Sequence, residues 1–150
     1  MNRIDYTSVL AAGYRAELEA LLFFNPEQHR FRDKIRTVIE THGVPVIHAE
    51  NNRLNVRLKN GSEVQTLYAL AGSKARSQLV GVVVYTRSNP ATITVLHIAV
   101  SEDYSSQGRH HKQMMVPLFI GKLREIGRQI KGVTMLRLLY DTDKFREIPV

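Results

Sequence analysis

Four consecutive polar residues, Arg109-His110-His111-Lys112, follow a short turn and stand at the start of a predicted helix. A helix N-terminus leaves backbone N–H groups without intrahelical partners and carries partial positive charge, so it is suited to anions. Cations there oppose the helix dipole at a cost of about 0.3–1 kcal/mol each, unless an anion offsets them. We therefore predict an anion-binding site at this turn. The alternative interpretation is an ordinary polar first turn.

Three side chains near the same turn are candidates for proton transfer. His97 lies on the preceding strand, and its ordinary pKa of about 6.5 suits a general base. Strand alternation places it on the face of Val95 and Ala99, so the alternative is a histidine buried in the core and hydrogen-bonded to a carbonyl. Glu102 is a second candidate base and otherwise a surface acid. Tyr140 is a candidate acid and otherwise a packing residue.

The basic run lies between a predicted strand and a predicted helix. Residues 94–100 are apolar and mostly β-branched, as in a buried strand, and residues 101–108 are polar. A long amphipathic helix is expected from about Gly108. Its apolar positions recur at spacings of three or four and are Met115, Phe119, Leu123, Ile126 and Ile130.

Two residues bear on the course of this helix. Pro117 should kink it, unless the regular helix begins only near that residue, and Gly132 ends it. Residues 133–140 form the next predicted strand. Because a helix crosses over before it, this strand should lie parallel to the strand that ends at Val100.

The stretch from Val100 to His110 resembles the phosphate loop of the GCN5-related N-acetyltransferases in the spacing from the strand valine to the first glycine, Gly108. Ser105 stands where the family has Arg or Gln, and His110 stands where the family has a small residue that lets the pyrophosphate approach the backbone. The resemblance covers residues 78–140. It implies that acetyl-CoA, or another acyl-CoA, binds with its pyrophosphate on backbone amides. The implied cofactor-binding residues are Ile98, Ala99, Val100, Gln107, Gly108, Arg109, His110, His111 and Lys112.

The function implied by this resemblance is transfer of an acyl group, normally acetyl, to an amine by direct attack on the thioester. The acceptor is a small-molecule or protein amine. In the family, the two strands on either side of the helix splay apart and the thioester lies between them. The alternative is a domain that keeps this fold without catalysis and binds protein or nucleic acid.

Composition sets the broader expectations. A chain of 150 residues, 43% of them apolar, predicts one domain over residues 1–150. There is no cysteine, and the histidines show no ligand spacing, so we expect neither disulfides nor a metal site. With no membrane-length apolar run and no apolar leader, we expect a cytoplasmic protein without membrane contact. The net charge of +7 favours polyanionic partners such as nucleic acid or coenzyme A.

Two helices are predicted in the first third of the chain. Asp5, Thr7 or Ser8 is the candidate cap of the first helix. Its apolar positions are Leu10, Tyr14, Leu18, Leu21 and Leu22. Asn25-Pro26 starts the second helix, which stops at Gly43. The second helix carries a basic face, either solvated or bound to an anion, that consists of His29, Arg30, Arg32, Lys34 and Arg36.

An antiparallel meander of strands is predicted between the second helix and the central turn. The predicted strands are residues 44–48, 53–59, 63–71 and 78–86. Pro45 restricts the first of them to a sheet edge. Asn60-Gly61 predicts a tight hairpin turn between the second and third strands. The last strand is apolar on both faces, as a central strand covered on both sides would be.

We predict an α+β fold that resembles the acetyltransferases, with a mixed, mostly antiparallel sheet and helices packed on both faces. The chain after Tyr140 is too short for the further helix and strands that the family carries there, so the C-terminal strands should be missing. The strand ending at Tyr140 would then be an unpaired edge. Because unpaired edges invite pairing, we expect a homodimer.

Overall fold

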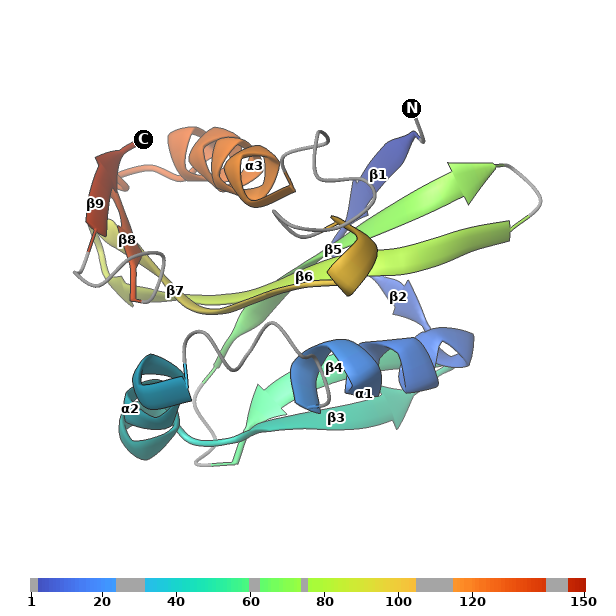
Figure 1. The fold of residues 1–150 in the computed structure, drawn as a ribbon. Coiled ribbons are helices and arrows are strands. Elements are labelled where there is room, and N and C mark those ends of the chain that lie inside the picture. The colour runs from blue at the N-terminus through green and yellow to red at the C-terminus, as the bar shows by residue number, and fades with distance from the viewer. Residues whose placement is uncertain (1–2, 24–31, 60–62, 74–75, 105–114, 140–145) are drawn as a thin grey trace.

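A computed structural model describes residues 3–23, 32–59, 63–73, 76–104, 115–139 and 146–150 (Figure 1). The fold is α+β, and in the described residues it comprises three helices, a mixed six-stranded sheet and a small antiparallel three-stranded sheet. Figure 1 shows α3 on one face of the larger sheet and α1, α2 and the small sheet on the other. Helices therefore cover both faces, as predicted.

The bounds of the elements follow in chain order. The first half contains β1 (Ile4–Thr7), β2 (Leu10–Ala11), the short 3₁₀ helix η1 (Ala12–Tyr14), α1 (Arg15–Phe23), α2 (Arg32–His42), β3 (Pro45–Glu50) and β4 (Arg53–Leu58). The second half contains β5 (Gln65–Ser73), β6 (Arg76–Asn89), β7 (Thr92–Val100), the 3₁₀ helix η3 (Glu102–Tyr104), α3 (Met115–Gln129), β8 (Met135–Leu138) and β9 (Arg146–Pro149).

The six-stranded sheet has the order β1-β5-β6-β7-β8-β9. All neighbours are antiparallel except β7 and β8, which are parallel because α3 crosses over between them. The predicted parallel strand after the helix is confirmed. β6 is central, and its residues from Leu79 to Tyr85 are buried on both faces, as their unbroken apolar run predicted.

The first helix begins later than the sequence predicted. Ile4–Thr7 pairs with β5, and Leu10–Ala11 pairs with β4, so the regular α-helix starts only at Arg15. Asp5 and Thr7 lie within a strand and do not cap a helix. Tertiary structure is the reason, because the four residues of β1 form an edge strand of a sheet whose other strands come from distant parts of the chain. The helix buries Leu18, Leu21 and Leu22, as predicted.

The helix α1 is tied to the sheet by two polar contacts. The carboxylate of Glu17 accepts a hydrogen bond from the backbone N–H of Leu79 at 2.8 Å, and the Tyr14 hydroxyl donates to the Ser77 carbonyl at 3.1 Å. The pairing of β5 with β6 shifts next to Leu79, where Val80 is the extra residue of a bulge. Glu17 therefore satisfies a backbone donor beside an irregularity in the sheet.

The prediction that the strands on either side of Asn60-Gly61 pair as a hairpin is wrong. β4 pairs with β3 and β2, whereas β5 pairs with β1 and β6. The observed hairpin joins β3 to β4 through Asn51 and Asn52, whose φ angles of 53° and 60° suit a type I′ turn. One face of β4 is charged and exposed, so β4 fits a sheet open to solvent on one side. The dipeptide itself lies outside the described residues.

Helix ends and the predicted edge strand agree better with the structure. The second helix ends before Gly43, whose φ is 93°, and β3 lies at an edge of the small sheet with Pro45 as its first residue. Gly132, with φ 93°, follows the end of α3. Pro117 lies in the first turn of the described α3, where its missing N–H costs no intrahelical bond. The start predicted for the second helix at Asn25-Pro26 lies outside the described residues.

The prediction that the strand after α3 is an open edge is wrong. Residues 146–149 return as β9 and pair antiparallel with all four residues of β8. Val150 then packs against Gly127 of α3, where an added Cβ would lie 2.8 Å from its Cγ1 atom. The unpaired edge that motivated the expectation of a homodimer is therefore covered by the chain itself.

Candidate functional site

β7 is the strand at which the sheet changes from antiparallel to parallel, since it pairs antiparallel with β6 and parallel with β8. The ladder between β7 and β8 runs from Thr92 opposite Met135 to Val95 opposite Leu138, and β7 continues to Val100. In open α/β sheets, ligands bind beyond the carboxyl ends of the strands, at the point where the strand order reverses. Of the predicted strand-turn-helix site, the structure describes β7 and η3, and residues 105–114 lie outside the described residues.

A β-bulge in β7 decides where the side chain of His97 lies. Tyr85 pairs with Val95 and Val84 pairs with His97, so Leu96 is an extra residue in β7. Val95 consequently joins the core on the α3 side, while Ala99 joins the core on the α1 side. The expectation that strict alternation puts His97 on one face with both residues is wrong, because the bulge interrupts the alternation between them.

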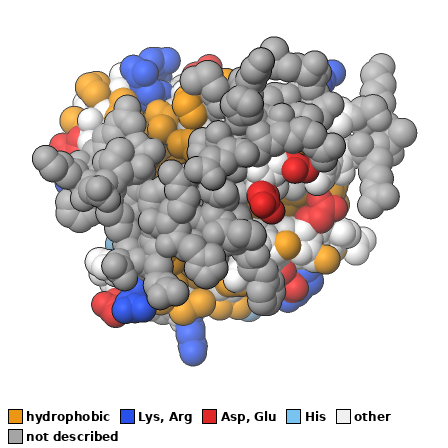
Figure 2. All heavy atoms as spheres, viewed as in Figure 1, with side chains coloured by type: hydrophobic (Ala, Val, Ile, Leu, Met, Phe, Trp, Pro, Cys, Tyr) orange, Lys and Arg blue, Asp and Glu red, His pale blue; other side chains and the backbone are white. Residues whose placement is uncertain are grey.

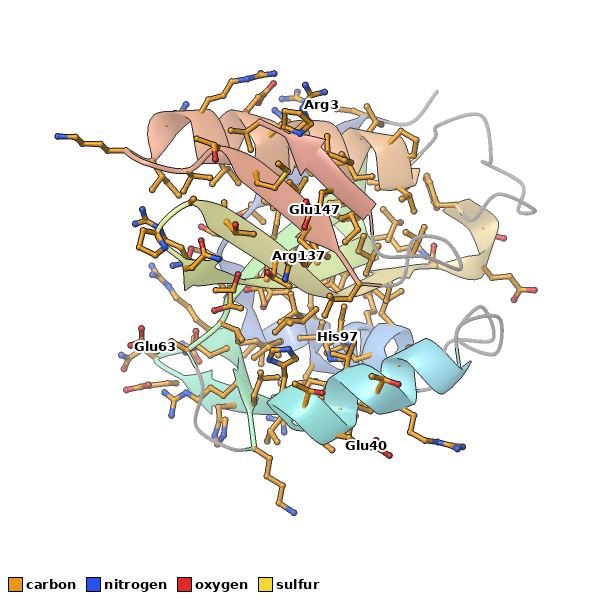
Figure 3. The ribbon with its side chains drawn as sticks, turned by 90° about the vertical axis from the view of Figure 1, so that its left-hand side faces the viewer. Arg3, Glu40, Glu63, His97, Arg137 and Glu147 are labelled. Atoms are coloured by element: carbon orange, nitrogen blue, oxygen red, sulfur yellow. The ribbon has the colours of Figure 1, made fainter. Side chains whose placement is uncertain are left out.

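His97 is buried between the larger sheet and the layer that contains α2 (Figure 3). Only 5% of its surface is exposed. Burial lowers the pKa of His97 to about 4, and the positive charge of His42 at the end of α2 adds to the effect. At neutral pH the imidazole is therefore uncharged, but it is a much weaker base than an ordinary histidine.

Glu102 lies immediately after β7, in the short helix η3. Its side chain and that of Asp103 are exposed, whereas Tyr104 is buried in the core on the α3 side. The turn is held by two backbone bonds, from the Ser101 N–H to the Val80 carbonyl at 2.9 Å and from the Tyr104 N–H to the Ser101 carbonyl at 3.0 Å. The structure thus places a solvated carboxylate at the carboxyl end of β7.

Ser101 is a residue of this region that the sequence analysis did not single out. Its hydroxyl oxygen is buried and has no hydrogen-bond partner among the described residues. A serine directly after a strand is common in turns, so its type and position alone gave no signal. Only the packing shows that this hydroxyl is enclosed.

The predicted cofactor residues of β7 are divided between the two faces of the sheet. Ile98 and Val100 contribute to the core on the α3 side, and Ala99 contributes to the core on the α1 side. The remaining predicted site residues lie outside the described residues, and these are Tyr140, Gln107, Gly108, Arg109, His110, His111 and Lys112.

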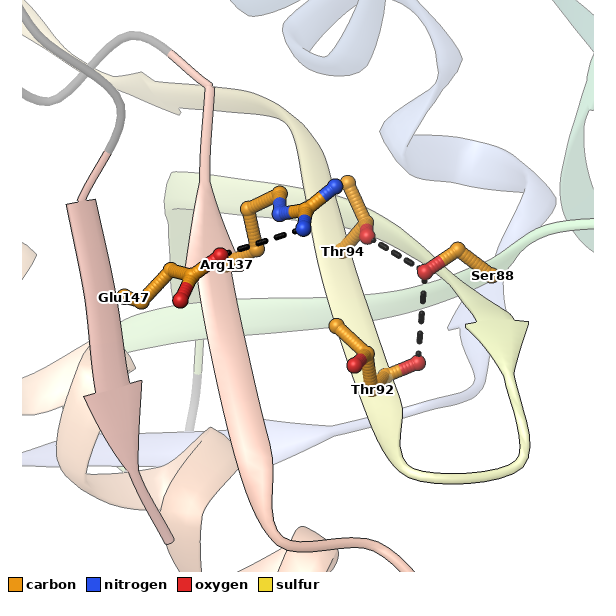
Figure 4. A network of polar contacts seen from close by, with 5 residues as sticks. All are labelled: Ser88, Thr92, Thr94, Arg137 and Glu147. Atoms are coloured by element: carbon orange, nitrogen blue, oxygen red, sulfur yellow. Dashed lines mark hydrogen bonds and ion pairs between the residues drawn. The ribbon is translucent and has the colours of Figure 1, made fainter.

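A polar network lies at the other end of the parallel pair (Figure 4). The Ser88 hydroxyl is 2.7 Å from that of Thr94 and 3.4 Å from the Thr92 carbonyl oxygen, and both threonines are buried. Arg137 of β8 pairs with Glu147 of β9 at 3.1 Å, with both side chains about half exposed. This network joins neighbouring strands and lies among the first residues of β7, so we assign it a structural role.

Open hollows among the described residues lie on the small sheet. One of about 720 Å³ is lined by β3, β4 and the residues before β5, including His48, Asn55, Arg57 and Glu63. Among the described residues, no three His, Asp or Glu side chains gather as the ligands of a metal ion would. No helix in the described parts of the chain is long and apolar enough to cross a membrane.

Comparisons of the chain with protein-family models, curated proteins and solved structures find no match.

Proposed function

We propose that this protein is an acyl-CoA-dependent N-acyltransferase of the GCN5-related type, which transfers an acyl group, normally acetyl, from coenzyme A to an amine. The observation that supports the proposal is the strand arrangement. Four antiparallel strands, β1, β5, β6 and β7, are followed by a helical crossover to the parallel β8. In this arrangement β7, the strand that precedes the glycine-containing turn in the sequence, pairs antiparallel with β6 and parallel with β8, and the resemblance implies that the cofactor pyrophosphate binds after this strand.

The reaction needs a neutral amine, whose nitrogen attacks the thioester carbon. The carbon–sulfur bond then breaks, the amine proton passes to a base or to water, and the departing thiolate takes up a proton. Glu102 fits the role of proton acceptor better than His97. Its carboxylate is exposed at the carboxyl end of β7, whereas His97 is buried toward α2 with a lowered pKa.

A ligand-stabilisation measurement tests the cofactor without knowledge of the acceptor. At a hundredfold excess over its Kd, acetyl-CoA should stabilise the fold by about 2.7 kcal/mol and raise the melting temperature by several degrees. Coenzyme A should act equally, and pantetheine, which lacks the pyrophosphate, should not. Gly108→Pro should abolish the shift because it removes one backbone N–H, and His110→Gly should enlarge it because it restores the small residue that the acetyltransferase loop has at this position. A melting temperature unchanged by millimolar acetyl-CoA, with no rescue by His110→Gly, would sink the proposal.

A second measurement tests the base. Glu102→Gln should lower the rate of coenzyme A release by about tenfold, less than the roughly hundredfold or more that a general base typically contributes, because water can replace it. The assay follows the free thiol with acetyl-CoA and a panel of primary amines and lysine peptides. Asp103→Asn is the matched control, since it removes the neighbouring exposed carboxylate and should leave the rate within about twofold. Equal losses in the two variants would remove Glu102 from this role.

The burial of His97 favours a second candidate function. A fold of this type in which the histidine of β7, His97, is enclosed in the core is also suited to a non-catalytic module that binds protein or nucleic acid. The two candidates differ in the melting experiment. Stabilisation by coenzyme A supports the enzyme, and its absence supports the module.

A further inference from the structure

The solvent face of α3 carries a row of positive charge. Arg124 and Arg128 are four residues apart in α3 and therefore lie on one side of the helix, and the exposed Lys131 follows two residues after the end of the helix at Gln129. Figure 2 shows Lys and Arg side chains gathered over α3. We call these three residues the α3 ridge.

The chain supports the ridge at both ends. Arg124 donates a hydrogen bond from Nε to the Pro149 carbonyl at 3.1 Å, which fixes its guanidinium over the end of β9. Arg87 donates from Nη2 to the Lys131 carbonyl at 3.0 Å and to the Pro90 carbonyl at 2.7 Å. This contact adds a fourth positive charge beside the carboxyl end of α3. The entropy cost of ordering the Arg124 side chain is therefore partly met before any ligand binds.

Acidic side chains do not neutralise the ridge from within the helix. Glu125 is the one acid in Met115–Gln129, and its carboxylate lies 3.5 Å from the Lys122 ammonium on the flank of the ridge. Favourable interaction with the helix dipole explains cations in the last turn, where Arg128 lies, but not Arg124 near the middle of the helix. The surface therefore holds more positive charge than helix stability requires.

We propose that the α3 ridge binds the phosphodiester backbone of nucleic acid. Membrane binding by a basic helix requires an apolar face that enters the lipid, and the apolar face of α3 is enclosed in the core through Met115, Phe119 and Leu123. Binding to phosphates needs only the exposed cations. The chain's net charge of +7 attracts the same partner from a distance.

The small sheet offers a less favourable basic surface and so provides a matched control. Arg53 and Arg57 lie on the exposed face of β4, and the exposed Lys59 directly follows the strand. Arg57 pairs with Glu50 at 3.8 Å, and Glu63 lines the same hollow. Replacing these three cations removes the same charge as replacing the ridge. It does so on the opposite side of the larger sheet (Figure 1).

The experiment measures binding of a fluorescent DNA duplex of about 20 base pairs by anisotropy, between roughly 50 and 200 mM salt. The triple variant Arg124→Gln, Arg128→Gln, Lys131→Gln should weaken binding at the lower salt by about tenfold or more. It should also reduce the slope of log K against log salt by about 2.7, the value for three lost phosphate contacts. The control triple Arg53→Gln, Arg57→Gln, Lys59→Gln should change affinity by less than about threefold.

Further variants and probes keep the test decisive. Arg128→Gln with Lys131→Gln leaves the Arg124–Pro149 bond intact and serves if the triple variant unfolds. Arg124→Lys with Arg128→Lys retains the charge and should retain binding.

Equal losses of affinity in the ridge and control triple variants would overturn the proposal, because they would show that net charge alone determines binding. Absence of DNA binding by the wild type, or binding only to phosphatidylserine vesicles or to an acidic peptide, would also overturn it.

Discussion

Gly81→Ala should destabilise the fold by about 3 kcal/mol, near the upper end of the usual cost of overpacking a core. Gly81 lies in the central strand β6, and a Cβ atom there would lie 2.6 Å from Cε2 and 2.8 Å from Cζ of Phe119. The Phe119 ring is fully buried and packs edge-on against Tyr6 at a centroid distance of 5.6 Å. It therefore has no open space into which it can move.

Urea unfolding measures this loss of stability, and two further variants test whether it comes from the contact with Phe119. Gly121→Ala, on the exposed side of α3 with no atom near the added Cβ, should be neutral or stabilising by up to about 1 kcal/mol. In a Phe119→Leu background, Gly81→Ala should cost less than about 1 kcal/mol, because the ring atoms that it strikes are gone. If the effects of the two substitutions on the free energy of unfolding were fully additive, the contact between residue 81 and Phe119 would not be the cause of the destabilisation.

The free energy of unfolding should fall by about 3 kcal/mol through His97 alone when the pH is lowered from 7 to below 4. Its pKa is about 4 in the folded protein and about 6.5 in the unfolded chain. The unfolded chain therefore takes up a proton first as the pH falls through 6.5, and the folded protein follows only near pH 4. Stability is fully present above pH 6.5 and is lost across this window.

The measurement is the free energy of unfolding against pH for the wild type and for His97→Gln. Removing the titrating group should make the decline between pH 7 and pH 4 shallower by about 3 kcal/mol, whatever the variant's stability at pH 7. His48→Gln is the control, since His48 is exposed on β3, and its profile should follow the wild type. Parallel profiles for His97→Gln and the wild type would contradict the assignment.

Burial of His97 also affects any pH–rate profile of the proposed transferase. A base with a pKa near 6.5 would give a loss of activity between pH 7 and 6. Because the pKa of His97 is lowered to about 4, such a loss has to come from another group, such as the amine substrate.

Periodicity in the sequence determined the strongly patterned elements. The apolar run from Leu79 to Tyr85 marked a strand covered on both faces, and the spacing of Met115, Phe119 and Leu123 marked the buried side of α3. Gly43 and Gly132 marked helix ends because the left-handed backbone conformation there favours glycine. The crossover by α3 determined that β8 would be parallel to β7. These features depend on local steric preference and on burial of one face of an element, and the pattern of residue types along the sequence predicts both.

Tertiary structure decided which strands pair and where the candidate site residues lie. Asn60-Gly61 is a strong local turn signal, yet β4 and β5 belong to different sheets, because only β4 has a face that can remain in water. Residues 4–7 became an edge strand and residues 146–149 covered the other edge, since each completes a surface formed by distant parts of the chain. Because of the bulge at Leu96, the side chain of His97 lies on the enclosed face of the sheet, toward α2. A bulge depends on the register with the neighbouring strand, and alternation within one strand carries no information about that register.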